Sequence, residues 1–151
     1  MTELTQQQVE QLIAATRAKG EKPDLRRRDL SGIGLFRVDL HQVDLTEANL
    51  RQANLIEANL IQANLSKANL TEANLVNANL SGANLSQSVL FQARLTGANL
   101  SQADLREANL NGATLEQADL TGANLQGAIY TSYTKWPLGF DPVATGAKKG
   151  Y

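Results

Sequence analysis

The sequence contains no cysteine, so disulfide bonds, thiolate metal sites and cysteine nucleophiles are all excluded. No apolar run approaches the ~20 residues that a membrane-spanning helix needs. The formal net charge is only −1, and a chain this close to neutral has no overall attraction to nucleic acid or to an anionic membrane. We therefore expect neither a membrane nor a nucleic acid as partner.

Histidine is scarce as well. His41, the one histidine, lies near Asp39 and Asp44, but further metal ligands, or a nucleophile beside a general base, are missing from its sequence neighbourhood. We expect no catalytic residue, no metal and no cofactor. The first residues also lack the basic and apolar parts of a signal peptide, which predicts a cytoplasmic protein.

Leucine, by contrast, recurs at every fifth position from Leu25 to Leu125 without a miss. The residue two before each leucine is alanine from Ala48 to Ala128, except at Ser88, and asparagine or aspartate usually stands between the two. A period of five fits neither a helix nor a flat strand. Because the step from leucine to the next alanine is odd, the chain must turn once per repeat to keep both on the same side.

Turns that always bend in the same sense wind a chain into coils, with leucine and alanine inside and the two variable residues outside. Successive coils would hydrogen-bond to each other at a spacing of ~4.8 Å. The repeat therefore predicts an all-β solenoid. With 151 residues, the chain has the length of one domain, and we expect residues 1–151 to form it.

Residues 4–20 predict a helix that covers the first coil. Thr5 and Gln8 fit a capping box, so the helix should begin near Gln6, and Gly20 supplies a left-handed stop. The end of a solenoid exposes unpaired backbone, which natural repeat proteins cover. A helix that binds a partner is the alternative interpretation.

Residues 21–47 are a degenerate start to the array, which becomes regular over residues 48–129. In the degenerate part other residues stand in the alanine position, namely Pro23, Arg28, Ile33, Val38 and Val43. A basic run, Arg26 to Arg28, lies beside Asp24 and Asp29. A nucleic-acid site needs a broad basic face, so we expect these charges to pair with one another on the surface.

The unit A-N-L-x-x, as in residues 58–62, resembles the pentapeptide repeat family, whose motif is alanine, then aspartate or asparagine, then leucine or phenylalanine, then two variable residues. The resemblance implies a right-handed quadrilateral parallel β-helix with four pentapeptides per coil, and hence about five coils in this chain. It also implies that Leu25 to Leu125 and Ala48 to Ala128 point inward. The residues alone leave the number of sides open.

Apolar residues in the first variable position are compatible with either four or three sides per coil. Phe36, Ile56 and Val76 recur every twenty residues, which favours four sides, but Ile61, Val76 and Phe91 recur every fifteen, which favours three. In a four-sided coil the first three form an outward apolar stripe, with Ile61 next to it across a corner. Such a stripe on a polar protein predicts a contact surface for a protein partner; scattered surface residues with good β-propensity are the alternative.

The rule of the repeat is broken once inside the regular array, over residues 88–95. Ser88 replaces the inward alanine, and Val89 and Arg94 replace asparagine. Such a departure is typical of a functional site or of repeat drift. Phe91 and Arg94 join the candidate protein-binding residues because both residue types are enriched at interfaces.

Residues 130–151 predict an irregular cap and tail rich in aromatic residues and proline. The rings would cover the open core, and Pro137 and Pro142 would keep the segment from adding a strand, with residues 147–151 a frayed tail. The stretch 133–142 also resembles an ending common in cyanobacterial pentapeptide repeat proteins, often with glutamate in place of Leu138. This resemblance implies a cyanobacterial source.

The sequence predicts a monomeric, non-catalytic, rigid scaffold that binds a protein of unknown identity, with regulation as one role that solenoids serve. The alternative is a mimic of DNA that binds a type II topoisomerase such as gyrase, a function that the family resemblance implies for some members. Such mimics are strongly acidic along one face, whereas this chain is almost neutral.

Overall fold

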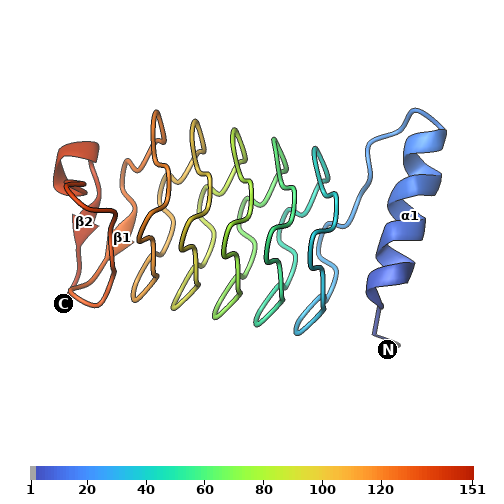
Figure 1. Cartoon of the computed structure of the whole chain (residues 1–151), viewed down its shortest axis with the longest axis horizontal. Helices are drawn as coiled ribbons and strands as arrows, with labels where there is room; N and C mark the ends of the chain where they lie inside the picture. The colour runs from blue at the N-terminus through green and yellow to red at the C-terminus, as the bar shows by residue number, and fades with distance from the viewer. Residues whose placement is uncertain (1–2) are drawn as a thin grey trace.

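A computed structural model describes residues 3–151; Met1 and Thr2 of the expected domain lie outside the described residues. Similar coils stack along the long axis of the molecule, with a helix beside the first coil and a pair of very short strands at the other end (Figure 1). The elements are α1 (Gln6–Ala18), β1 (Ile129–Tyr130), the 3-10 helix η1 (Val143–Thr145) and β2 (Lys148–Lys149).

Each coil of the solenoid takes twenty residues. Parallel backbone pairs join Asp24 to Asp44, Asp29 to Asn49 and so on to Asn109 and Ile129, each with the residue twenty further along. One such pair occurs in every pentapeptide, so a coil has four sides. The fifteen-residue spacing that favoured three sides does not describe this fold.

The interior consists of stacked leucine and alanine side chains. The leucines from Leu25 to Leu115 are at most 2% exposed, whereas Leu120, near the C-terminal end, is 8% exposed. Most residues in the alanine position are buried as well, including Ile33, Val38 and Val43, but Arg28 is exposed because its charge stays in water at the edge of the first coil. One continuous apolar cluster runs from α1 to the last residues of the chain.

The corners of the coils are four-residue turns closed by a backbone hydrogen bond, as from Ala48 N–H to the carbonyl of Leu45 at 3.0 Å. The second variable residue has a positive φ in every turn, from Arg27 at 58° to Gly127 at 74°, as the third residue of a type II turn does. β-branched side chains are strained in that conformation. Of the two variable positions, only the first holds such residues, for example Ile56 and Val76.

Asparagine before leucine supports these turns, as expected. The side-chain oxygen of Asn59 accepts a hydrogen bond from the backbone N–H of Ile61 at 3.1 Å, and the same bond recurs along the array. Short polar side chains commonly hold turns in this way. At Val89 and Arg94 the side chain has no carbonyl oxygen, so the turns that follow lack this bond.

The helix α1 begins as predicted. Thr5 and Gln8 form the capping box, with Gln8 N–H donating to Thr5 Oγ1 at 3.2 Å and Thr5 N–H to Gln8 Oε1 at 2.9 Å. Val9 and Ile13 are buried and belong to the same apolar cluster as the first leucines. Burial of each such side chain contributes roughly 1.5–3 kcal/mol. The helix therefore packs on the first coil.

Arg17 joins α1 to the backbone edge of that coil. Its guanidinium donates to the carbonyl of His41 at 2.7 Å and contacts the carbonyl of Asp39 at 3.5 Å. In the next coil the equivalent carbonyls, those of Asn59 and Ile61, accept from backbone N–H groups of the preceding coil. On this side of the first coil, Arg17 thus replaces two of the backbone donors that a preceding coil would supply.

The C-terminal segment corrects two expectations. It does add a strand, because β2 pairs in parallel with β1, and Lys135 pairs with Thr114. Residues 147–150 are not frayed, since Ala147 is 6% exposed and Gly150 N–H donates to the carbonyl of Tyr130 at 2.7 Å. Both prolines lie in or beside turns, Pro142 at the start of η1, where the ladder needs no donor from them.

The predicted aromatic residues do pack at this end. Tyr130 and Trp136 meet edge to face with ring centroids 5.4 Å apart, and Trp136 stacks on Phe140 at 5.2 Å. Tyr130 takes the position of a leucine and is buried. The segment is therefore an additional, irregular turn of the solenoid that carries an aromatic cluster.

Candidate functional site

The four-sided coil stacks Phe36, Ile56 and Val76 at one corner of three successive coils. Their neighbours are joined by backbone bonds at this corner, from Arg37 N–H to Ile56 O and from Glu57 N–H to Val76 O, both 3.0 Å. Phe36 is 44% exposed, and Ile56 and Val76 are partly exposed. These three residues, which we call the apolar stripe, lie at the outer surface as the sequence predicts for four sides.

The other candidates lie around the stripe. Phe91, 40% exposed, occupies the preceding corner of its coil, and Arg94 projects from the side between that corner and the corner of the stripe. Ile61 occupies the corner after the stripe, as expected. Five of the six candidates thus border or occupy one side of the solenoid, and Ile61 lies beyond it.

Arg37 is a neighbour of the stripe that the sequence analysis missed. Its guanidinium carbon lies 4.9 Å from the centre of the Phe36 ring, and its Nε donates to Glu57 Oε2 at 2.7 Å. A cation over an aromatic face is attracted by the ring. The adjacency of Phe36 and Arg37 in the sequence could have indicated their contact. The position of Glu57 beside them follows only from the length of twenty residues per coil.

The broken repeat contains no polar site. Ser88, in the inward position, is 1% exposed and donates its hydroxyl to the carbonyl of Leu85 at 2.6 Å. Its one polar group is therefore satisfied inside the core. What the interruption changes is the surface, where Val89, Phe91 and Arg94 interrupt the columns of polar residues.

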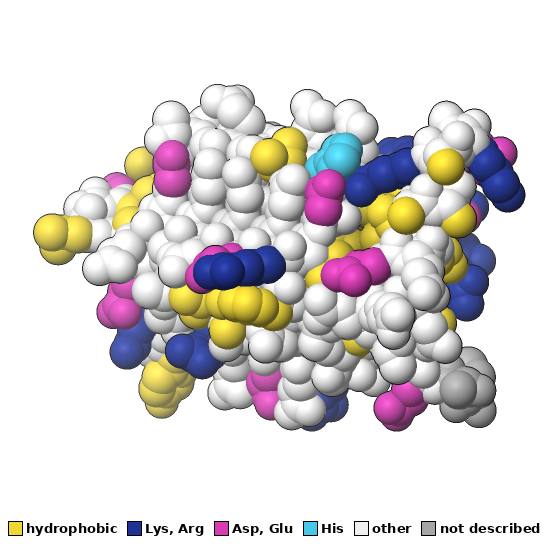
Figure 2. Space-filling model, turned by 45° about the vertical axis from the view of Figure 1, so that its right-hand side comes forward, with side chains coloured by type: hydrophobic (Ala, Val, Ile, Leu, Met, Phe, Trp, Pro, Cys, Tyr) yellow, Lys and Arg dark blue, Asp and Glu magenta, His cyan; other side chains and the backbone are white. Residues whose placement is uncertain are grey.

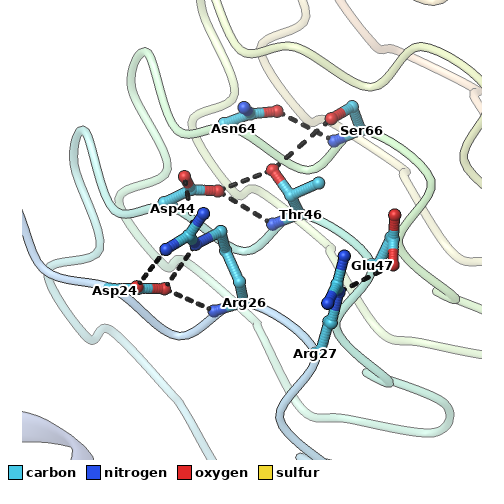
Figure 3. A network of polar contacts seen from close by, with 8 residues as sticks. All are labelled: Asp24, Arg26, Arg27, Asp44, Thr46, Glu47, Asn64 and Ser66. Carbon is cyan, nitrogen blue, oxygen red and sulfur yellow. Dashed lines mark hydrogen bonds and ion pairs between the residues drawn. The ribbon is translucent and has the colours of Figure 1, made fainter.

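Charged residues elsewhere pair with one another. Arg26 lies between two carboxylates, 2.7 Å from Asp24 and 3.9 Å from Asp44, and Arg27 pairs with Glu47 at 3.0 Å (Figure 3). The guanidinium and backbone N–H of Arg26 lower the pKa of Asp24 to about 2. The prediction therefore holds for Arg26 and, through a carboxylate of the next coil, for Arg27. Arg28 forms no ion pair within residues 3–151, and Asp29 bonds Ser31 instead.

His41 lies beside a cavity between the end of α1 and the first coils. Its Nδ1 is 2.7 Å from Asp39 Oδ1, whereas the side chain of Asp44 is bonded to Thr46. Burial raises the pKa of Asp39, but the hydrogen bonds from His41 and the charge of Arg17 outweigh it and lower that pKa. The pair orients the side chain of His41, and no group of three potential metal ligands occurs within residues 3–151.

The surface has a mixed character. On the side shown in Figure 2, hydrophobic side chains reach the surface in small separate patches, and acidic side chains are scattered. Over the described part of the chain, no helix is long and apolar enough to cross a membrane.

The fold and this surface define a β-solenoid of four-sided coils, a class in which the interior is filled and the outward residues are free to vary. The sequence matches the model of pentapeptide repeats, in eight copies, over residues 35–71, 68–106 and 98–129. The chain belongs to the pentapeptide repeat family, whose solved members form right-handed quadrilateral β-helices.

Three solved structures illustrate the relationship. The chain is similar to alr5209, a pentapeptide repeat protein from Nostoc PCC 7120, with 34% identity, coverage of 94% of this chain and 95% of that one, and a TM-score of 0.50. HetL, from the same cyanobacterium, is 32% identical over 82% of this chain and 71% of its own, with a TM-score of 0.41. QnrB1, a plasmid-mediated fluoroquinolone resistance protein, is 19% identical over 84% and 79%, with a TM-score of 0.49. A comparison with curated proteins finds no match.

Proposed function

We propose that this protein is a non-catalytic, rigid scaffold that binds a protein partner through the apolar stripe and the side bordered by Phe91 and Arg94. The observation that carries the proposal is the recurrence of Phe36, Ile56 and Val76 at one corner of successive coils. Apolar groups at a fixed spacing on a rigid body lose little conformational entropy on binding. Arg94 and Arg37 add the polar rim that protein interfaces have.

A scaffold role also suits the interior. Leucine and alanine fill it, and most polar side chains lie on the outer surface, Ser88 and Thr134 being buried, whereas catalysis needs convergent groups in a concave site. We further propose that the two end structures, α1 and residues 130–151, act as caps that keep the chain monomeric. A cytoplasmic location and a regulatory role belong to the same proposal.

The topoisomerase-binding mimic of DNA is the alternative that this proposal replaces. A mimic needs a continuous acidic face, but Asp24, Glu47 and Glu57 each form an ion pair with an arginine, and so does Asp104. A gyrase supercoiling assay separates the two functions. We expect equal supercoiling with and without the protein, and inhibition would favour the mimic.

The stripe is tested by Ile56→Glu combined with Val76→Glu. Both positions lie outside the core, so we expect an unchanged circular dichroism spectrum and the loss of partners that the wild-type protein retains in affinity capture. The matched control is Ser66→Glu with Ser86→Glu, which places the same charges in the same repeat position at another corner. Equal capture by both folded variants would refute the stripe as the binding surface.

A further inference from the structure

The last turn of the solenoid covers only part of the coil before it. Backbone bonds join this turn to the side of Leu115, through Lys135, and to the side of Tyr130, through β2. Between them, the segment from Leu120 to Leu125 receives no backbone bond from residues 131–151, and the next bond is the one from Gly127 N–H to the carbonyl of Gly146 at 3.0 Å. The aromatic cap is therefore incomplete.

The uncovered sides present an open edge of backbone donors. The N–H groups of Leu120, Gly122 and Leu125 have no acceptor among residues 3–151, whereas the N–H groups one coil earlier donate to Asp119, Thr121 and Asn124. The exposure of the side chains agrees with an open edge, because Leu120 is the most exposed of the leucines from Leu25 to Leu125 and Ala123 is only half-buried. An unpaired sheet edge is a template for a further strand.

A shallow, open cavity of about 360 Å³ lies against this edge. It is lined by Ala118 and Leu120 from the open side and by Pro137, Leu138 and Phe140 from the last turn. Leu138 is fully exposed. An aliphatic side chain that entered the cavity would cover both the exposed leucine and the end of the core.

The charged residues of the open segment itself, within residues 116–127, are acidic, while Lys135, Lys148 and Lys149 of the last turn pair with the adjoining sides. Glu116 and Asp119 are exposed and have no ion-pair partner in the described part of the chain. Hydrogen bonds from the side chain and backbone of Thr121 lower the pKa of Asp119, so its carboxylate is ionised at neutral pH. Basic side chains of a partner would therefore be favoured here.

We propose that this edge binds an extended, basic segment of a partner protein by β-augmentation, with Leu120 and Gly122 donating to its backbone and an aliphatic side chain in the cavity. A second copy is disfavoured, because self-association of the edge would bring its carboxylates together and because α1 covers the opposite end of the solenoid. This site is separate from the apolar stripe and does not depend on it.

The test uses a fluorescent peptide, Lys-Val-Lys-Val-Lys-Val, with the whole protein. Binding is followed by fluorescence anisotropy, and the bound site by amide chemical shifts and hydrogen exchange. We expect the amide signals of Leu120 and Gly122 to shift and their exchange to slow. A peptide of the same sequence methylated on alternate backbone nitrogens should not bind, because it cannot complete the ladder.

Two conservative variants probe the charge. Glu116→Gln with Asp119→Asn keeps the side-chain oxygen that Thr121 N–H uses and should weaken binding of the lysine peptide about fivefold. The control, Asp29→Asn, makes the same change at the other end of the array, where Asp29 bonds Ser31 in the same way, and should leave binding unchanged. A glutamate–valine peptide should bind more weakly than the lysine peptide.

Several results would overturn the proposal. Equal binding of the methylated peptide would show that no ladder forms, and shifts confined to another surface would place the peptide elsewhere. Dimers in sedimentation whose Leu120 amide is already protected without peptide would assign the edge to a second copy. Each result leaves the test of the apolar stripe unaffected, since that test uses other residues.

Discussion

The two ends of the solenoid are closed by different means. At the N-terminal end a helix lies on the first coil, buries Val9 and Ile13, and satisfies two edge carbonyls through Arg17. At the C-terminal end the chain continues the ladder for one more turn and leaves the segment from Leu120 to Leu125 without backbone partners from that turn. A helix covers an edge, whereas a further coil moves the edge outward. The comparison shows that the helix covers the apolar core of the first coil, whereas the last turn leaves the backbone donors from Leu120 to Leu125 open to pairing.

The largest expected difference between the ends is the tolerance of a buried charge. Leu75→Lys, in the middle of the array, and Leu25→Lys, under the helix, should unfold or aggregate the protein, because an unpaired buried charge costs several kcal/mol. Leu120→Lys should remain folded with a smaller loss, since its ammonium group can reach water at the open edge. Thermal unfolding of the three variants measures the loss of stability. An equal loss in Leu120→Lys would show that the C-terminal end is closed.

The next effect concerns the apolar anchor of the helix. Ile13→Ala should lower the free energy of unfolding by about 2–4 kcal/mol, because it leaves a cavity between α1 and the first coil. At the other end Leu138→Ala should cost less than about 0.5 kcal/mol, since that side chain is fully exposed. Urea denaturation compares the two, and an equal cost would contradict the difference in packing.

A smaller effect is expected for the polar anchor. Arg17→Ala should cost about 1.5–3 kcal/mol at most, the value of charge-assisted hydrogen bonds, because the carbonyls of Asp39 and His41 lose their donor. Amide exchange should quicken in α1 and the first coil and stay unchanged near β2. Arg17→Lys should restore only part of the protection, since an ammonium group lacks the planar fork. Unchanged exchange in Arg17→Ala would show that Arg17 does not stabilise the contact between α1 and the first coil.

The smallest effect is the response to acid. A lowered pKa in the folded state gives stability that is complete above the unfolded pKa of about 3.9 and is lost as the pH falls through the folded value. Asp24, with a pKa of about 2, and Asp29 and Asp39 lie in the first coil. Asp104 and Asp119, toward the other end, also have lowered pKa values. Exchange should therefore quicken in the coils of these carboxylates between about pH 4 and pH 2 and change least in the middle of the array. Uniform quickening along the array would contradict it.

Much of the fold follows from the sequence alone. The leucine period, the inward alanines and the capping box at Thr5 are local patterns, and the structure agrees with each. The positive φ of the second variable position also had a signal, namely the absence of β-branched residues there. The number of sides was ambiguous because two sets of apolar residues gave different periods.

The rest depends on contacts between distant segments. The interpretation of the prolines in the last turn was wrong because a proline prevents strand pairing only where the ladder needs its N–H as a donor. Here the donors are the backbone N–H groups of Lys135 and Lys148, at other positions. Arg17 could not be recognised as an anchor before α1 was placed against Asp39 and His41. Of the candidate surface, the stacking of Phe36 on Ile56 follows from the coil length, while the binding role of the six candidate residues stays a prediction.

The pairing of each residue with the one twenty further along fixes the distances between outward side chains. At one corner these side chains repeat every ~4.8 Å along the axis, so Ile56 and Val76 are separated by one such step. A partner that recognises both is sensitive to a length as well as to a chemistry. Insertion of one whole coil between Ile56 and Val76 would lengthen the distance between them by ~4.8 Å and leave both side chains unchanged.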